Sequence, residues 1–345
     1  MLALRSRRGH AWLTGVTYHR IGQAKDAGLL DPETFDASAA QFERQLEYLS
    51  QRHHFVSLDD IRRYLDGGEL PPNAVYISFD DGYRECLETT LPILQRFGVR
   101  ATFFIATSFT EDRRLPWWDR LSLLVRRRKH DQVVLDHPYP MELDLSRESE
   151  AIHQLQVLVK THYGLDLQRF LDDLAEATGA RLEPDEEREM VDRHLLTWNE
   201  LRELKAAGQD LQCHTHTHRV LHTLRPEDLR QELRLSRRIL TERVGGPIDA
   251  IAYPVGYPIG GANRIRRALE AEGFRVGFSN NTGANPKTAR PDRFDVRRIA
   301  TDASFTDTWF RAFMAWPALA YARMEPHEIQ LPRAPGRMDT ASEAE

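Results

Sequence analysis

Two short segments carry side chains that together could bind a metal ion. The first reads SFDDGY at residues 78–83, and the second reads HTHTH at residues 214–218. Two imidazoles and one carboxylate form a facial ligand set that leaves positions on a divalent ion open for water and substrate. The remaining carboxylate is then free to act as a base on that water. The two segments together predict metal-assisted hydrolysis.

Each segment alone also has a purely structural explanation. An Asp-Asp-Gly tripeptide is common in turns, because Asp bonds its own backbone and Gly accepts a positive φ. A short His-rich tract is more often a solvated loop than a metal site. The pairing favours the functional interpretation, because both segments follow strand-like runs, at residues 74–77 and 210–213. Side chains at strand ends meet at one mouth of a β/α barrel.

The two segments resemble the hallmark motifs of polysaccharide deacetylases of the NodB-homology type, carbohydrate esterase family four, which read (T/S)FDDG and H(S/T)xxH. Flanking residues are similar as well, since residues 101–105 resemble the next strand and residues 252–256 the third motif. The resemblance covers roughly residues 14–110 and 196–300. It implies an α/β fold, a distorted (β/α) barrel, and metal-dependent removal of N-acetyl groups from an N-acetylated sugar in a polysaccharide or glycan precursor.

The resemblance also implies a role for each motif residue. Asp81, His214 and His218 would hold the divalent metal, and Asp80 would take the proton from the water bound to it. Zinc suits two histidines and a carboxylate, whereas nickel, cobalt and iron tolerate the same set. The third motif, with Pro254, Val255, Gly256 and Tyr257, would supply backbone N–H donors for the oxyanion and contacts to the substrate.

Two departures from the family pattern call for substitutes. Family members often carry Arg at the head of the third motif, where this chain has Ala252, so we expect Arg297 or Arg298 to supply the basic group, with Arg298 also a candidate substrate contact. The family's C-terminal Leu-x-His motif has no good match, so His19, at the end of the first apolar strand, is the candidate acid for the leaving amine. This resembles the branch that includes poly-N-acetylglucosamine deacetylases. The alternative is that His19 only caps its strand by hydrogen bonding.

The alternation of strand and helix signals predicts one barrel with an insertion. We expect the barrel in residues 1–110 and 197–320, and a mainly helical insertion in residues 111–196. Within the insertion, helices are predicted at 149–162, 166–177 and 185–194 and a hairpin around 132–145.

Insertions at such junctions open onto the catalytic face and can shape the substrate cleft. Trp117 and Trp118 open the insertion, and they would either stack on sugar rings or anchor the insertion to the barrel. Residues 332–345, rich in Pro, Ala, Ser and Glu, predict a disordered tail.

Composition narrows the function classes further. The 345 residues carry a formal net charge of -5, with no basic stripe interleaved with aromatics, so a nucleic-acid partner is not expected. Two cysteines, Cys86 and Cys213, imply no disulfide framework. The start has no signal-peptide pattern and no apolar run is long enough to cross a membrane, so we expect a cytoplasmic enzyme, with peripheral contact at the inner membrane face left open.

Two alternatives to a sugar deacetylase remain. A catalytically inactive, glycan-binding relative would keep the fold without the chemistry. A hydrolase of a non-sugar amide would use the same metal chemistry on another C–N bond. The presence of three ligands, a base and a candidate acid favours an active enzyme, because decayed sites commonly lose one of them.

Overall fold

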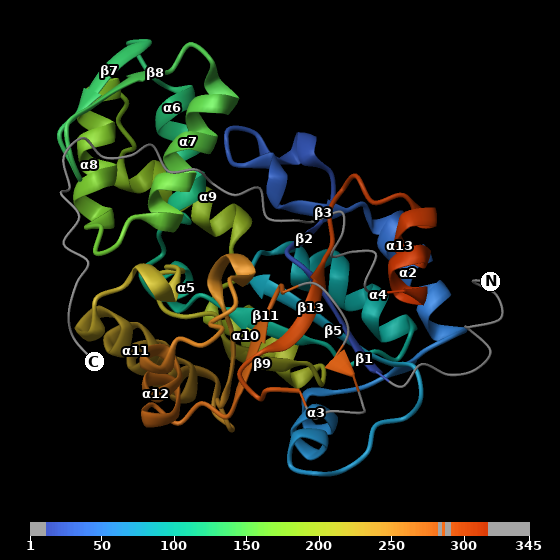
Figure 1. Cartoon of the computed structure of the whole chain (residues 1–345). Coiled ribbons are helices and arrows are strands. Elements are labelled where there is room, and N and C mark those ends of the chain that lie inside the picture. The colour runs from blue at the N-terminus through green and yellow to red at the C-terminus, as the bar shows by residue number, and fades with distance from the viewer. Residues whose placement is uncertain (1–11, 282–284, 287–290, 317–345) are drawn as a thin grey trace.

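A barrel of seven parallel strands forms the centre of the computed structural model, which describes residues 12–281, 285–286 and 291–316. The barrel closes because the first strand pairs in parallel with both the second and the last barrel strand (Figure 1). The predicted distorted (β/α) barrel is therefore confirmed. In chain order its strands are β1 (Trp12–Tyr18), β5 (Ala74–Asp81), β6 (Thr102–Ile105), β9 (Asp210–Cys213), β10 (Ala250–Ala252), β11 (Val276–Ser279) and β13 (Val296–Ala300).

Short strands flank the barrel. One pairs in parallel with β5, another pairs antiparallel with β1, and two small separate sheets have two strands each. These strands are β4 (His54–Phe55), β12 (Asn285–Pro286), the pair β2 (Arg20–Ile21) and β3 (Phe35–Ala37), and the hairpin β7 (Gln132–Leu135) and β8 (Met141–Asp144).

Helices follow most of the barrel strands, as the alternation of strand and helix signals predicts. Two of them begin with capping boxes, in which Ser57 pairs with Asp60 and Thr197 pairs with Glu200, so their starts are encoded locally. These helices are α2 (Ala39–Ser50), α3 (Leu58–Leu65), α4 (Leu91–Arg96), α10 (Trp198–Ala206), α11 (Pro226–Val244), α12 (Asn263–Ala271) and α13 (Asp307–Ala315).

Strand alternation divides the core into two layers. In β5, Val75, Ile77 and Phe79 pack into the large cluster shared with the surrounding helices, whereas Tyr76 belongs to the cluster that includes Phe104 and Phe278 of other barrel strands. The Tyr76 and Phe278 rings are stacked with centroids 5.2 Å apart. Because successive side chains point to opposite faces, Ser78 and Asp80 follow Tyr76 on the inner face of the barrel.

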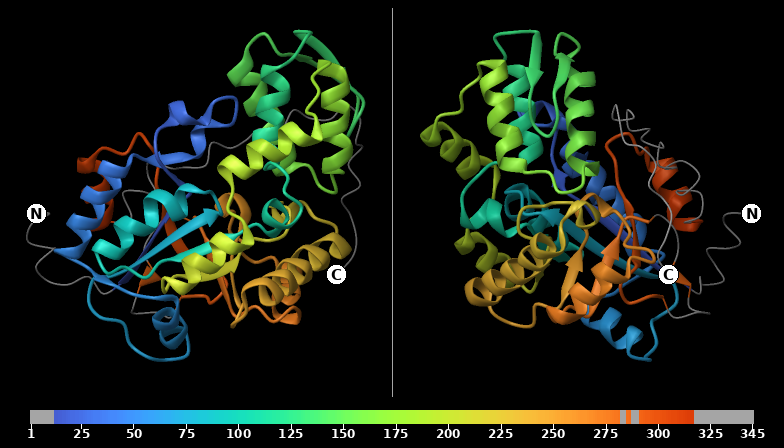
Figure 2. Two further views of the ribbon diagram at one scale, coloured as in Figure 1. Left: turned by 180° about the vertical axis from the view of Figure 1, so that it is seen from behind. Right: turned by 60° about the vertical axis from the view of Figure 1, so that its left-hand side comes forward.

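The segment between β6 and β9 carries its own hydrophobic cluster. It stands beside the barrel as a group of helices with one hairpin, as both views show (Figure 2). The hairpin and the three predicted helices are confirmed, and a further helix over residues 117–126 was missed. The helices are α5 (Thr107–Glu111), α6 (Trp117–Arg126), α7 (Glu148–Thr161), α8 (Leu167–Thr178) and α9 (Pro184–His194).

Parts of the predicted organisation lie outside the described residues. These are the proposed tail at 332–345, the first eleven residues and residues 317–320. Both cysteines are buried free thiols, in line with the absence of a predicted disulfide framework. Within the part of the chain that the structure describes, the helices are too short or too polar to cross a membrane.

Candidate metal centre and active site

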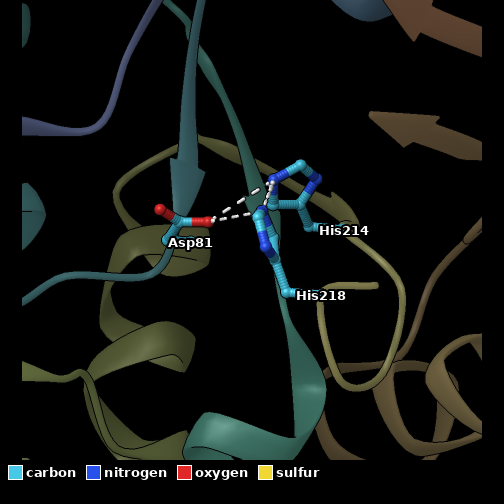
Figure 3. A group of neighbouring side chains, drawn as sticks. All are labelled: Asp81, His214 and His218. Carbon is cyan, nitrogen blue, oxygen red and sulfur yellow. Dashed lines mark hydrogen bonds and ion pairs between the residues drawn. The ribbon is translucent and has the colours of Figure 1, made fainter. Parts of the chain in front are cut away.

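Asp81, His214 and His218 converge at the mouth of the barrel, although the two motifs are far apart in the chain. Oδ1 of Asp81 lies 3.4 Å from Nε2 of each histidine, and the two Nε2 atoms are 3.0 Å apart. All three side chains are buried, and their ligand atoms lie within 4.8 Å of one another. Figure 3 shows one carboxylate oxygen of Asp81 at the end of its strand facing both rings.

Both motifs turn through backbone conformations that direct these side chains to one point. Asp81 has φ 76° and is followed by Gly82 with φ 93°, so the chain leaves β5 through two consecutive left-handed residues. The histidine loop has φ 65° at Thr215 and φ 55° at His218. Non-glycine residues in this region carry a conformational cost, which the surrounding contacts must offset.

Glu232 of α11 supplies such contacts to the histidine loop. Its carboxylate accepts hydrogen bonds from the backbone N–H groups of His216 at 2.9 Å and Thr217 at 2.8 Å, and from the Thr217 hydroxyl. Glu232 is buried, so these charge-assisted bonds are shielded from water. Glu232 therefore holds the loop that carries both candidate histidine ligands, and no local sequence pattern indicates this role.

The protonation of the cluster suits cation binding. Burial lowers the pKa of His214 to about 4 and that of His218 well below its usual value, so both imidazoles are neutral at pH 7. Nδ1 of His214 lies 2.9 Å from the carbonyl oxygen of Ala252, which fixes the N–H on that side and leaves Nε2 as an acceptor. Burial, reinforced by the nearby charge of Asp80, raises the pKa of Asp81 to about 7.

These three residues fit a divalent cation. Oδ1 of Asp81 is buried and has no hydrogen-bond partner among the described residues. Nε2 of His214 is an acceptor, and Nε2 of His218 lies only 3.0 Å from it, so both ring nitrogens face the same point. Ligand atoms each about 2.0–2.2 Å from one ion are roughly 3.0–3.4 Å apart, which agrees with the three separations here.

Asp80, the predicted base, is paired with Arg298 of β13 inside the barrel. Nη1 and Nη2 of Arg298 each donate to one oxygen of Asp80 at 2.8 Å, and Nη1 also donates to Thr17 and Ser78 at 3.1 Å. Burial alone would raise the pKa of Asp80, but the Arg298 guanidinium holds it below its usual value. A side chain at Gly15 would place Cβ 3.0 Å from Cγ of Arg298, so glycine makes room for this pair.

The structure distinguishes between the two arginines expected to replace the missing Arg at position 252. Arg298 is fully buried and is occupied by Asp80, whereas the side chain of Arg297 is 43% exposed. Arg298 was also expected to contact the oxyanion or substrate, and in the structure its guanidinium lies in the barrel interior, over the ring of Phe104. It instead orients Asp80 and keeps this carboxylate charged.

His19 follows β1 and contacts Asp36 of β3. Its Nδ1 lies 3.2 Å from Oδ2 of Asp36, and its backbone N–H donates to the same oxygen. Burial by itself would lower the pKa of His19, but the charge of Asp36 and its hydrogen bond outweigh this, and the pKa rises to about 10. The side chain is 29% exposed, so part of the ring is open to solvent. Sequence reasoning missed Asp36, which lies in no recognisable motif.

The third motif forms a tight turn after β10. Val255 and Gly256 both have positive φ, and a Cβ on Gly256 would lie 2.3 Å from the Asn280 side chain. The N–H groups of Gly256 and Tyr257 donate to the carbonyls of Tyr253 and Pro254 in the same turn. Proline has no N–H, which leaves the N–H of Val255 as the backbone donor to test.

Trp117 and Trp118 are largely buried, which favours their role as anchors of the insertion over stacking on sugar rings. They are only 4% and 6% exposed. Nε1 of Trp117 donates to the carbonyl oxygen of His218 at 3.1 Å, and the Trp118 ring packs edge-on against the His218 ring with centroids 4.6 Å apart. Nε1 of Trp118 donates to the hydroxyl of Tyr83, the last residue of the first motif, at 3.0 Å. The tryptophans anchor α6 behind the metal centre, which is the alternative considered for them.

Comparison with known proteins agrees with this geometry. A family model described as polysaccharide deacetylase matches residues 67–171 and 175–277, which is more than half of the chain. The protein belongs to the polysaccharide deacetylase family.

Among curated proteins, poly-beta-1,6-N-acetyl-D-glucosamine N-deacetylases match part of the chain. The protein from Staphylococcus aureus is 30% identical over 101 residues, and that from Staphylococcus epidermidis is 24% identical over 103 residues. Each match covers 27% of this chain and 35% of the relative. The chain therefore matches about a third of the length of these relatives.

Among solved structures, the fold is similar to the Streptococcus pyogenes deacetylase PplD in complex with acetate. The TM-score is 0.56 at 17% identity, over 88% of this chain and 98% of that chain. IcaB from Ammonifex degensii gives a TM-score of 0.54 at 17% identity, over 90% and 98% of the two chains. At this level of identity the likeness shows the fold alone.

Proposed function

We propose that this protein is a metal-dependent N-deacetylase that removes acetyl groups from an N-acetylated sugar in a polysaccharide or glycan precursor. The observation that carries the proposal is the convergence of Asp81, His214 and His218, with Asp80 beside them, its Oδ2 4.0 Å from Nε2 of His214. The partial likeness to poly-beta-1,6-N-acetyl-D-glucosamine N-deacetylases supports a glycan as the substrate.

Each residue of the site has a separate role in the proposed reaction. A divalent cation held by Asp81, His214 and His218 supplies Lewis-acid polarisation of the acetamide carbonyl and lowers the pKa of water. Zinc suits this donor set, and nickel, cobalt and iron fit it as well. Asp80, kept ionised by Arg298, accepts the proton of the attacking water. The N–H of Val255 donates to the carbonyl oxygen as that oxygen gains negative charge.

His19 completes the reaction as the acid. Held by Asp36, it carries a proton and delivers it to the sugar nitrogen as the C–N bond breaks, so that acetate and a free amine leave. The contact with Asp36 supports this role over simple capping of a strand, because a carboxylate on Nδ1 raises the basicity of the ring. It also supports placing the chain with the branch of the family in which the first strand supplies the acid histidine.

The test combines metal analysis with product analysis. The purified protein is assayed for acetate release from N-acetylglucosamine oligomers and for products from non-sugar amides, with and without added zinc, nickel or cobalt. Asp80→Asn should lower the rate of acetate release about 100-fold or more while metal content is kept. Asp66→Asn, which removes an exposed carboxylate outside the site, is the matched control and should match the parent.

Each outcome separates the candidate functions. Acetate from the sugar oligomers, lost in Asp80→Asn, supports the proposal. Turnover of only the non-sugar amides would assign the same centre to another C–N substrate. Oligomer binding without any turnover in the metal-loaded protein would indicate a glycan-binding relative. Full activity in Asp80→Asn would remove the base role from Asp80.

A further inference from the structure

A cavity lies between the inserted helices and the histidine loop. Its volume is about 610 Å³, within the range of small-molecule sites. Helices α5, α6 and α8 line it, together with Thr217 and Arg219 on either side of His218. Phe109 and Trp117 line the cavity and also contact His218, so aromatic side chains separate it from the metal centre. The proposed deacetylation does not use this cavity.

Arg219 places a buried charge in the cavity wall. It is only 6% exposed, and its Nη1 donates to the carbonyl oxygen of Leu165 at 3.1 Å. Its Nε and Nη2 are buried without a hydrogen-bond partner among the described residues. Burying a guanidinium whose N–H groups are only partly hydrogen-bonded costs free energy. A nearby anion would offset that cost, because charges attract strongly in a medium of low dielectric.

Two further arginines line the same cavity. The side chain of Arg120 on α6 is 15% exposed, and its nearest carboxylate oxygen in the described structure, on Asp172, is 3.7 Å from Nη2. Its Nε has no hydrogen-bond partner among the described residues. Arg114 is exposed, and its Nη1 makes a long contact of 3.5 Å with the Gln168 side chain. Neither guanidinium is engaged in a close two-point pair with a carboxylate.

The carboxylates around the cavity only partly offset the charge of these arginines. Asp112 is the carboxylate in the wall, and its Oδ2 lies 4.0 Å from Nε2 of His216. Glu232, Asp228 and Asp166 are close enough to act on the charge of Arg219, but none of them accepts a hydrogen bond from its Nε or Nη2, and Glu232 is already bonded to the backbone of the histidine loop. Three guanidinium groups therefore face one carboxylate in the wall, and the balance favours an anion.

We propose that this cavity binds an organic anion whose phosphate or carboxylate oxygens pair with Arg114 and Arg120 in front of the buried charge of Arg219. Guanidinium groups bind both anions through paired N–H donors. The remaining wall includes Leu115, Trp117 and other apolar side chains, which suits a ligand with an apolar body. The proposal goes beyond the deacetylase function and does not depend on it.

Calorimetric titration of the full-length, metal-loaded protein tests the site with three probes. Phenyl phosphate carries a phosphate on an apolar ring, benzoate carries a carboxylate, and benzyl alcohol is the neutral counterpart. We expect the two anions to bind and the alcohol to bind at least about 10-fold more weakly. The ratio of the two anion affinities identifies which anion the site prefers. Binding should weaken as salt is raised.

Substitutions locate the bound anion. Arg120→Gln should weaken binding of the preferred anion about 10- to 100-fold, whereas Arg120→Lys keeps the charge and should recover part of the loss. Arg169→Gln is the matched control, because Arg169 is an exposed arginine of α8 outside the cavity wall, and binding should stay within about 2-fold. Acetate release from a neutral acetylated sugar should be unchanged in Arg120→Gln, which keeps this test separate from that of the deacetylase function.

Three results would overturn the proposal. The first is anion binding unchanged in both Arg114→Gln and Arg120→Gln, which would place the anion elsewhere, for example on the catalytic metal. The second is equal affinity for benzyl alcohol and phenyl phosphate, which would make the cavity a purely apolar site. The third is no detectable binding of either anion at low salt. Circular dichroism of each variant confirms that a loss of binding is not a loss of fold.

Discussion

Replacing Arg298 by Met would test the central electrostatic feature of the site. The substitution keeps a long apolar side chain in the barrel but removes both hydrogen bonds to Asp80, each 2.8 Å long. Asp80 is 2% exposed, so water cannot take the place of the guanidinium. Removing one member of a buried ion pair costs about 3–5 kcal/mol, because the other charge is left buried and unpaired. We therefore expect the free energy of unfolding of Arg298→Met to fall by about that amount at neutral pH.

The fall in the free energy of unfolding of Arg298→Met should be larger at neutral pH than at acidic pH. Arg298 holds the folded-state pKa of Asp80 below its usual value, so the pair stabilises the fold above the pKa of an unfolded Asp, about 3.9. That contribution is lost as the pH falls through the lower folded-state pKa. In Arg298→Met the largest opposing charge is gone, so burial raises the pKa of Asp80 and less free energy is lost near pH 4, where more of the carboxyl is neutral. The difference between parent and variant should therefore be largest at neutral pH and shrink toward pH 4.

Urea denaturation at pH 7.5 and pH 4.5, with both proteins in the same metal state, measures this difference. Arg297→Met is the matched control on the same strand, because the Arg297 side chain is 43% exposed and its Nε lies 3.8 Å from Oδ2 of Asp295. Its effect should stay within about 0.5 kcal/mol. Asp80→Asn in the Arg298→Met background should recover much of the stability, because it removes the unpaired charge. Equal losses at both pH values, or no recovery in the double variant, would refute the reasoning.

Three further predictions concern the metal ligands and their support. Chelation of the metal should lower Tm by about 5 °C or more, with recovery on adding zinc, and an unchanged Tm would argue against a bound ion at His214. Glu232→Gln should weaken metal affinity about 10- to 100-fold in a chelator competition, because the histidine loop loses a charged acceptor, and a change under 3-fold would contradict this. Asp36→Asn should lower the pKa of His19 from about 10 toward 6.5, seen by NMR titration. In the parent, the raised pKa of His19 stabilises the fold fully below about pH 6.5, and this contribution fades as the pH rises toward 10. The variant should therefore lose stability mainly at acidic and neutral pH. An unchanged titration of His19 would refute its pairing with Asp36.

Much of the fold follows from local signals in the chain. Capping residues such as Ser57 and Thr197 fix helix starts, and strand-like runs ending in the two motifs mark the barrel strands. The long insertion was predicted with its hairpin, but α6 was missed, because the apolar side chains of Trp117 to Val125 were not recognised as one buried helix. Its burial comes from packing on the rest of the insertion and on His218, which no local pattern reveals.

The sequence alone determined which residue types meet at the mouth of the barrel. SFDDG and HTHTH encode both the ligand atoms and the turns that direct them, because each is a short segment at the end of one strand. Tertiary structure decided their partners. Arg298 is 218 residues from Asp80 and reaches it only because β13 closes the barrel against β1, and Asp36 meets His19 through pairing of β2 with β3. Such contacts depend on the register between strands, and register is set by packing of the whole barrel rather than by any one segment.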